Sequence, residues 1–318
     1  EVVLGNALGA GGNPARRVAL AAGLSERVAG LTLDRQCCGG LDALVMGAAL
    51  IASGQAEVVA AGGVESYSRR PLRLRTDPDG GPPVAYDRPP FTSWPDRDPE
   101  MDEAAEALAR SWNIARAAQD AWAVDSHRKA RMAEMRSEVV PLAGVERDTF
   151  TRDLTPRLAA RAPGLVGSIT AANAAVAADG AAVCLLVSDR VAARLPDPGL
   201  AYRGGITLGA RPDLPGVAPV EAIGALFDRT GTTPADLSVA EGMEAYAVQA
   251  IACVEGAGLD PAIVNPGGGG LARGHPVGAS GAINAVRLWH EVKRRGGTGL
   301  AAIAAAGGLG TAVMLSVR

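Results

Sequence analysis

Gly30-Leu-Thr-Leu-Asp-Arg-Gln-Cys37-Cys38-Gly39-Gly40-Leu41-Asp-Ala-Leu44 carries the strongest signal in this chain for both architecture and chemistry. The segment predicts a strand, a tight turn and a helix in succession, with Gly39 and Gly40 allowing the backbone to turn sharply. Apolar residues then recur at helical spacing, at Leu41, Leu44, Val45, Ala48 and Ile51. A thiol where a helix begins lies at the positive end of the helix dipole, which lowers its pKa. Cys37 is therefore a candidate nucleophile, although a buried structural cysteine fits this segment equally well.

Composition restricts the class of protein. The chain has 318 residues and a formal net charge of −3, which argues against nucleic acid as a partner. No apolar run approaches the roughly 20 residues that a membrane-spanning helix needs, so we expect no membrane insertion. The cysteines show neither a CxxC pair nor the spacing of a zinc site, so we expect no metal and a reducing, cytoplasmic location; they are Cys37, Cys38, Cys184 and Cys253.

Helix and strand patterns alternate at both ends of the chain. We expect helices at 16–23 and 41–53, a buried strand at 56–61, a surface excursion at 70–100, a helical region at 102–135 broken near Asn113, and a strand at 181–187. The turn–helix–strand–Gly-Gly plan of residues 37–63 recurs at 278–308. This repeat predicts two similar α/β halves related by a pseudo-twofold axis, with catalytic groups meeting where helix N-termini converge.

A second chemical site lies in Asn265-Pro-Gly-Gly-Gly-Gly-Leu-Ala-Arg-Gly-His275-Pro-Val-Gly-Ala-Ser-Gly281. A histidine on a glycine-rich loop before a helix is better explained by close approach to a ligand than by core packing. His275 could pair in space with Cys37 and activate its thiol for attack on a thioester or amide. A phosphate cradle is the alternative, but the loop lacks both the P-loop and the dinucleotide fingerprints. His127 and His290 fit structural or solvated roles.

These motifs, taken in order along the chain, resemble the thiolase family. Cys37-Cys-Gly-Gly-Leu followed by Ala60-Ala-Gly-Gly-Val-Glu-Ser66 is similar to the family's nucleophile segment. Gly167-Ser-Ile-Thr-Ala-Ala-Asn-Ala-Ala175 is similar to its Gly-Thr-Val-Thr-Ala-Gly-Asn-Ala-Ser stretch, and Glu244-Ala-Tyr-Ala247 to its Asn-Glu-Ala-Phe-Ala box without the asparagine. The His275 loop and Gly307-Gly-Leu-Gly310 are similar to its last two motifs.

The resemblance implies an α/β thiolase fold with five layers, αβαβα, built from two βαβαβαββ halves and an inserted loop domain. We expect residues 1–68 and 165–189 to form the N-terminal half, 69–164 the loop domain and 190–318 the C-terminal half. Relative to that fold, Glu1 falls inside the first half and a central strand would be absent, so we expect residues to precede Glu1 in the natural chain. The resemblance also implies a homodimer or homotetramer.

Two departures from the family bear on the chemistry. Thiolases use a second cysteine to move a proton at the α-carbon of the acyl-CoA, and Ala304 stands at that position here. In the family, an asparagine holds a water that stabilises the oxyanion. Met243 stands at that position here and cannot donate a hydrogen bond. The resemblance implies an oxyanion hole formed by the backbone amides of Cys37 and Ala306.

The resemblance also implies substrate contacts, at Met101, Ala175, Gly274, Ser280 and Gly307. Ala175 replaces a serine of the family, and Glu100 precedes Met101 where many members have a histidine. The arginines of the excursion could meet phosphates, although a solvated charged loop is the simpler interpretation; they are Arg69, Arg70, Arg73 and Arg75.

The sequence thus predicts an acyltransferase or condensing enzyme that carries an acyl group on Cys37, with His275 as its base. The donor would be an acyl-CoA or a carrier-protein thioester, used as a substrate with no bound cofactor. The acceptor could be an amine, an alcohol, water or a thiol, and decarboxylating condensation also stays open. One alternative is a degenerate scaffold subunit with a heteromeric partner. Another is an acetyl-CoA acetyltransferase in which Cys38 or Glu244 replaces the missing acid–base group.

Overall fold

The N-terminal half folds around a four-stranded sheet in the computed structural model, which describes residues 1–318. Its strands run in the order β2-β1-β3-β8, with β1 parallel to both neighbours and β8 antiparallel to β3. The elements of this half are β1 (Val2–Gly5), α1 (Pro14–Ala21), β2 (Gly30–Leu33), α2 (Gly39–Ala52), β3 (Val58–Ser66) and β8 (Asp179–Val187).

The C-terminal half has a second four-stranded sheet, ordered β10-β11-β12-β9, in which β10 is parallel to β11 and β12 is antiparallel to both of its neighbours. Val264 adds an isolated parallel bridge to Ala240, outside the four strands. The elements are β9 (Ala201–Gly209), α7 (Ala218–Thr230), β10 (Leu237–Gly242), α8 (Ala247–Gly256), α9 (Gly270–Arg273), α10 (Val277–Arg295), β11 (Thr298–Ala305) and β12 (Leu309–Ser316), with the short α6 (Asp189–Ala192) before them.

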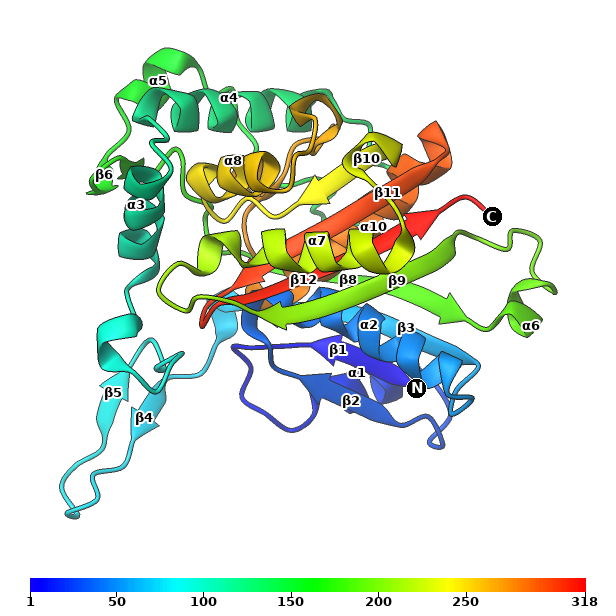
Figure 1. Ribbon diagram of the computed structural model, residues 1–318. Helices are drawn as coiled ribbons and strands as arrows, with labels where there is room; N and C mark the ends of the chain where they lie inside the picture. Colours follow the sequence, from blue (N-terminus) through cyan, green and yellow to red (C-terminus); the bar gives the residue numbers. More distant parts are fainter.

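The two sheets enclose a layer of helices, so the expected five-layer order is confirmed (Figure 1). Helix α1 covers the outer face of the first sheet, α2 and α10 lie between the sheets, and α7 covers the outer face of the second. The unit α2–β3–β8 corresponds to α10–β11–β12, since each helix leads into an antiparallel strand pair. This correspondence is the pseudo-twofold relation that the internal repeat predicted.

The core between the sheets consists mainly of aliphatic side chains. Leu41, Leu44 and Val59 from the first half pack with Leu288, Ile303 and Val313 from the second. Burying each leucine or isoleucine side chain contributes about 1.5–3 kcal/mol. This apolar layer holds α2 and α10 side by side, and both helices begin at one end of the molecule.

The first sheet is continuous, because β1 is paired on both sides. The gap that a missing central strand would leave is not present, and the free edges of this sheet are at β2 and β8. The sequence argument that invoked an absent central strand is therefore wrong on this point.

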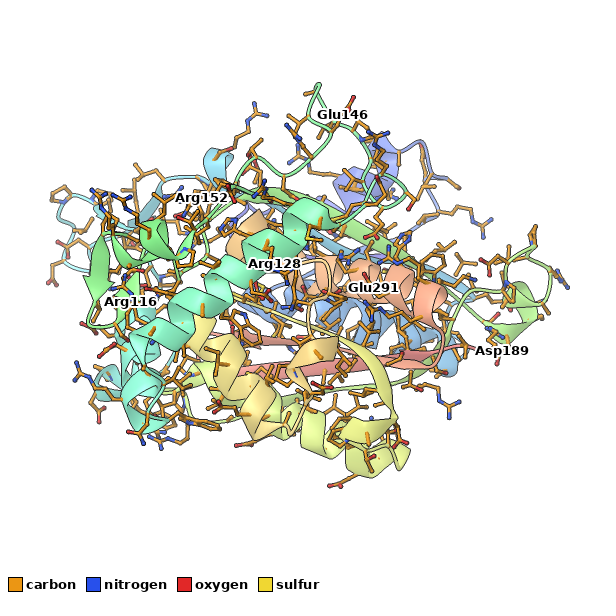
Figure 2. All side chains as sticks on the ribbon, turned by 90° about the horizontal axis from the view of Figure 1, so that it is seen from above. Arg116, Arg128, Glu146, Arg152, Asp189 and Glu291 are labelled. Atoms are coloured by element: carbon orange, nitrogen blue, oxygen red, sulfur yellow. The ribbon has the colours of Figure 1, made fainter.

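The region between the halves extends from the body of the protein (Figure 1). It contains β4 (Arg73–Arg75), β5 (Val84–Tyr86), α3 (Met101–Ser111), α4 (Arg116–Met132), α5 (Pro156–Ala160) and β6 (Gly164–Val166), which pairs with β7 (Ile169–Thr170). The expected helix break is present, and Asn113 there adopts a positive φ of 53°. Helices α3 and α4 both pack against α8. Figure 2 shows α4 crossing the upper face, with Arg116 and Arg128 along its length.

None of the helices combines the length and the apolar character needed to cross a lipid bilayer.

His127 has a structural role, because it connects α4 to the segment around Arg152. It lies on α4 with only 2% of its surface exposed, and its Nδ1 accepts a hydrogen bond from the Arg152 amide at 3.3 Å. Burial lowers the pKa of His127 to about 4. The imidazole is therefore neutral in the folded protein, in the state that an acceptor Nδ1 requires.

We expect the stability of the protein to fall as pH falls from about 6.5 toward 4. Over this range the unfolded chain binds protons that the buried His127 excludes, which costs up to about 3 kcal/mol for this residue. His127→Asn keeps a side-chain acceptor but does not titrate there. Urea unfolding at several pH values should therefore give a shallower pH dependence for the variant, and an unchanged slope would contradict this assignment.

Candidate active site

Cys37 lies at the junction between β2 and α2, in a short 3₁₀ turn formed by Gln36–Cys38. The sharp change of direction occurs at Gln36, whose φ is 45°, and Asp34 Oδ1 accepts a hydrogen bond from its amide at 2.9 Å. Gly39 has helical dihedral angles, so the expected glycine turn is wrong. A helix that begins two residues after Cys37 places the sulfur at the end of α2 but outside its first turn.

The glycines instead allow α2 to approach α10 closely. A Cβ added at Gly40 would lie 2.6 Å from the Ala282 nitrogen, and one at Gly281 would lie 2.5 Å from the Leu41 nitrogen. Real Cβ atoms do not tolerate such distances, so only glycine fits at either position. The two helices therefore meet backbone to backbone at their first turns, next to Cys37.

His275 reaches Cys37 from the loop that precedes α10. The distance from Cys37 Sγ to His275 Nε2 is 3.1 Å, across 238 residues of sequence. The other ring nitrogen, Nδ1, is 2.6 Å from Ser280 Oγ, and the backbone amide of His275 donates to the Val176 carbonyl at 2.7 Å. Ser280 thereby fixes the plane of the ring, and the predicted Cys–His pairing is present in the structure.

Burial determines the charge state of this pair. It raises the pKa of the Cys37 thiol to about 12 and lowers the pKa of His275 to about 4. The expectation that the helix dipole lowers the pKa of Cys37 is therefore wrong, because desolvation of the thiolate outweighs it. The resting pair is a neutral thiol beside a neutral imidazole, and an unprotonated Nε2 can accept the thiol proton.

Cys37 and His275 open into a cavity of about 670 Å³. This volume lies within the range of small-molecule sites. Met101, Ala175, Ala304 and Ala306 also line it, as expected for site residues. Much of the remaining wall is apolar and comes from α3 and from the segments around it, including Phe91, Ala104, Ala105 and Leu108.

Three predicted substrate contacts do not line the cavity. Gly274, at φ 96°, packs against Ala178 and Phe150, and Gly307 approaches the Phe91 carbonyl. Ser280 contacts His275 and not the open space. These residues lie outside the cavity wall and support the residues that line it. The resemblance alone did not distinguish such supporting residues from residues that contact the substrate.

The two departures from the family have different positions. Ala304 presents its methyl group at the cavity wall. Met243 is 4% exposed and does not line the cavity; its side chain packs in the core beside Gly270. Met243 therefore contributes apolar packing to the core and no polar group to the cavity.

Neither Cys38 nor Glu244 can replace a missing acid–base group. Cys38 is fully buried, with its sulfur 3.5 Å from the Ile303 carbonyl. Glu244 is 1% exposed and accepts hydrogen bonds from Trp122, Ser126, Asn265 and the Leu271 amide. Both lie outside the cavity wall, and Glu244 instead joins α4, α9 and the segment before α8.

Sequence reasoning missed several polar residues of the cavity. Of the four arginines of the excursion, only Arg73 lines it, and Arg73 donates to the Ala7 carbonyl at 2.8 Å. Arg88 is also at the wall, where it pairs with Asp98 at 2.7 Å. Tyr246 lies there too, and its hydroxyl donates to Asp102 at 2.6 Å. The one available signal was the tyrosine in Glu244-Ala-Tyr-Ala247, where the family has phenylalanine.

Comparisons with known proteins agree with this fold. Residues 1–190 match the family model of the thiolase N-terminal domain, and residues 200–317 match that of the thiolase C-terminal domain. The chain is 40% identical over 332 residues to "Putative acetyl-CoA C-acetyltransferase YhfS" of Bacillus subtilis, covering 100% of this chain and 87% of that protein. It is 34% identical over 339 residues to "Putative acetyl-CoA C-acetyltransferase VraB" of Staphylococcus aureus, covering 99% and 86%.

Two solved structures are similar over the whole chain. The human mitochondrial 3-ketoacyl-CoA thiolase superposes with a TM-score of 0.91 at 28% identity, covering 100% of this chain and 86% of that one. The Acat5 thiolase from Ascaris suum, solved in complex with coenzyme A, superposes with a TM-score of 0.90 at 31% identity, covering 99% and 87%.

The contact between Ser280 and His275 can be tested directly. Ser280→Ala should slow alkylation of Cys37 by iodoacetamide by roughly 10- to 100-fold, because a misoriented imidazole no longer takes the thiol proton in line. Ser280→Thr keeps the hydroxyl and serves as the matched control. Equal alkylation rates in Ser280→Ala and the unmodified protein would show that the hydroxyl does not orient the ring.

Proposed function

This chain belongs to the thiolase family of acyltransferases, and we propose that it forms an acyl-thioester on Cys37 from an acyl-CoA or a carrier-protein-bound donor. The observation that carries the proposal is the 3.1 Å contact between Cys37 Sγ and His275 Nε2 at the wall of the cavity. The relatives named as acetyl-CoA C-acetyltransferases and the neighbour that binds coenzyme A support a coenzyme A thioester as donor.

Acylation begins from the neutral pair. Cys37 sulfur attacks the thioester carbonyl as its proton moves to His275 Nε2, so that no isolated thiolate forms in the buried site. The new carbon–sulfur bond replaces the bond to coenzyme A. His275 then returns the proton to the departing sulfur, and no net proton is gained or lost.

The backbone amides of Cys37 and Ala306 would stabilise the oxyanion of this step. Neither amide donates to another residue of the protein, and both residues line the cavity. Backbone amides at the cavity wall without a partner elsewhere in the protein are suitable donors for an oxyanion hole. These steps use only groups of this chain and the thioester substrate.

Claisen condensation by the two-cysteine route is impaired in this proposal. Ala304 occupies the wall where the family has its second cysteine, and a methyl group cannot carry a proton. Cys38 and Glu244 are buried and committed elsewhere, so they do not substitute for it. Formation of the acyl-enzyme needs no chemistry at the α-carbon and is unaffected by the change.

We further propose that the protein acts as a homodimer or homotetramer in the cytoplasm. The edge strand β2 has a free side, and Leu31 on it is 39% exposed. Four free cysteines without a disulfide fit a reducing compartment.

Intact-mass spectrometry tests the acyl-enzyme. Incubation with acetyl-CoA or a longer acyl-CoA should add one acyl mass to the protein, and Cys37→Ala should add none. His275→Ala should slow the reaction by about 10²–10⁴-fold, the usual effect of losing a general base. Cys184→Ala, outside the cavity, is the control and should behave like the unmodified protein. No Cys37-dependent adduct with any CoA or carrier-protein thioester would sink the proposal and favour a scaffold subunit.

Restoring the second cysteine tests the impaired condensation. The unmodified protein should cleave acetoacetyl-CoA with coenzyme A only slowly, and Ala304→Cys should raise that rate by roughly 10²-fold or more. Ala302→Cys places a thiol on the same strand but in the core, and should not help. Rapid cleavage by the unmodified protein would mean that another group already moves the α-proton.

A further inference from the structure

A tyrosine–carboxylate pair lies on the cavity wall, and the acylation step does not use it. Tyr246 precedes α8, and its hydroxyl donates a hydrogen bond to Asp102 Oδ1 at 2.6 Å. Asp102 is the second residue of α3, so this bond joins the region between the halves to the C-terminal half. Tyr246 lines the same cavity as Cys37, His275 and Ala304.

The backbone fixes Tyr246 on both sides. The Ala175 amide donates to the Ala245 carbonyl at 2.9 Å, and the Ala247 amide donates to the Asn173 carbonyl at 2.8 Å. Tyr246 itself forms an isolated antiparallel bridge with Ala174. The backbone at Tyr246 is therefore fixed by segment 173–175, and its hydroxyl is fixed by Asp102 on α3.

The bond to Asp102 leaves the Tyr246 oxygen as an acceptor. A phenol has one proton to donate, and here that proton points to the carboxylate. No other protein group bonds to the phenol oxygen, so its remaining lone pair is available at the cavity wall. Burial, followed by the bond to Asp102, raises the pKa of Tyr246, so the group stays a phenol at neutral pH.

We propose that Tyr246, backed by Asp102, receives the proton of an acyl acceptor that carries an O–H or N–H group. This inference rests on the proposed acyl-enzyme at Cys37. It names the class of acceptor that takes the acyl group from Cys37: an alcohol or an amine. A hydroxyl or amine hydrogen-bonds to a phenol oxygen, whereas a carbon-bound α-hydrogen is at most a weak donor. The pair therefore does not restore what Ala304 removed.

The transfer step balances as follows. The acceptor oxygen or nitrogen attacks the acyl carbon on Cys37, and its proton moves to the Tyr246 oxygen while the Tyr246 proton moves to Asp102. The bond from the acyl carbon to Cys37 sulfur breaks as the sulfur takes up a proton from solvent through His275 Nε2, 3.1 Å away, so that no isolated thiolate forms. Asp102 releases its proton to solvent, so the ester or amide forms without net change in protons. Asp102 acts through Tyr246 and is a positioning residue.

A half-reaction experiment separates this step from acylation. The protein is first acetylated on Cys37 with acetyl-CoA and freed of coenzyme A. The loss of the acetyl group is then followed by intact mass after adding ethanolamine, glycerol or coenzyme A. Tyr246→Phe should slow transfer to ethanolamine and glycerol by roughly 10²-fold, the size of a lost proton-transfer group. Return of the acetyl group to the coenzyme A thiol should not change.

Two further variants exclude a merely structural effect. Asp102→Asn keeps a hydrogen-bond acceptor for the phenol but cannot take its proton, so it should reproduce the selective loss. Tyr202→Phe removes a hydroxyl from β9, outside the cavity, and should change nothing. The rate of acetylation is recorded for each variant, and transfer is timed only after Cys37 is fully acetylated, so a variant that fails to fold is recognised before the transfer step.

Three outcomes would overturn the inference. Tyr246→Phe could transfer the acetyl group to ethanolamine and glycerol at the unmodified rate. It could slow acetylation by acetyl-CoA as much as transfer, in which case the phenol binds the donor. Asp102→Asn could behave like the unmodified protein, which would leave only a hydrogen bond that fixes the ring. Failure of the unmodified protein to form acetyl-Cys37 would instead count against the proposed function.

Discussion

The close crossing of α2 and α10 is the constraint on which the site depends. Glycine at positions 40 and 281 lets the two helices touch through their backbones at their first turns. Cys37 lies two residues before α2 begins, and His275 lies two residues before α10 begins. The backbone contact therefore sets the 3.1 Å separation between sulfur and imidazole, and the apolar core between the sheets holds it. A side chain at either glycine would push the two groups apart.

Burial then decides how this pair can react. The thiol and the imidazole each resist becoming charged, because an isolated ion in this site loses much of its hydration. Proton transfer between neighbours at the moment of attack avoids that penalty. The helix dipole, which would favour a permanent thiolate, is the weaker effect here, because the helix starts two residues beyond the sulfur.

The family's condensation machinery is changed in two distinct ways. At Ala304 the cavity wall keeps its shape but loses a proton carrier. At Met243 a side chain has become part of the core, so that position no longer offers a polar group to the site. In the proposed function, acyl-enzyme formation keeps Cys37 as nucleophile and His275 as base, whereas proton removal from carbon lacks the cysteine and the asparagine that the family resemblance implies. This asymmetry underlies the proposal of acyl transfer to a heteroatom.

Local pattern determined much of this protein. Helical and strand periodicity and the internal repeat predicted two similar α/β halves, and the Cys37 and His275 motifs predicted that the two side chains pair. The resemblance of these motifs to the thiolase family implied the five layers. Charge state, cavity and partners depended on tertiary structure. The contact between Cys37 and His275 spans 238 positions, and the Tyr246–Asp102 bond spans 144 positions. Whether Ser280 touches substrate or only His275 is likewise decided by how α10 packs. The periodicity of one segment does not show which of its residues a distant segment will contact or bury. Only the folded structure therefore determined the charge state, the cavity and the hydrogen-bond partners.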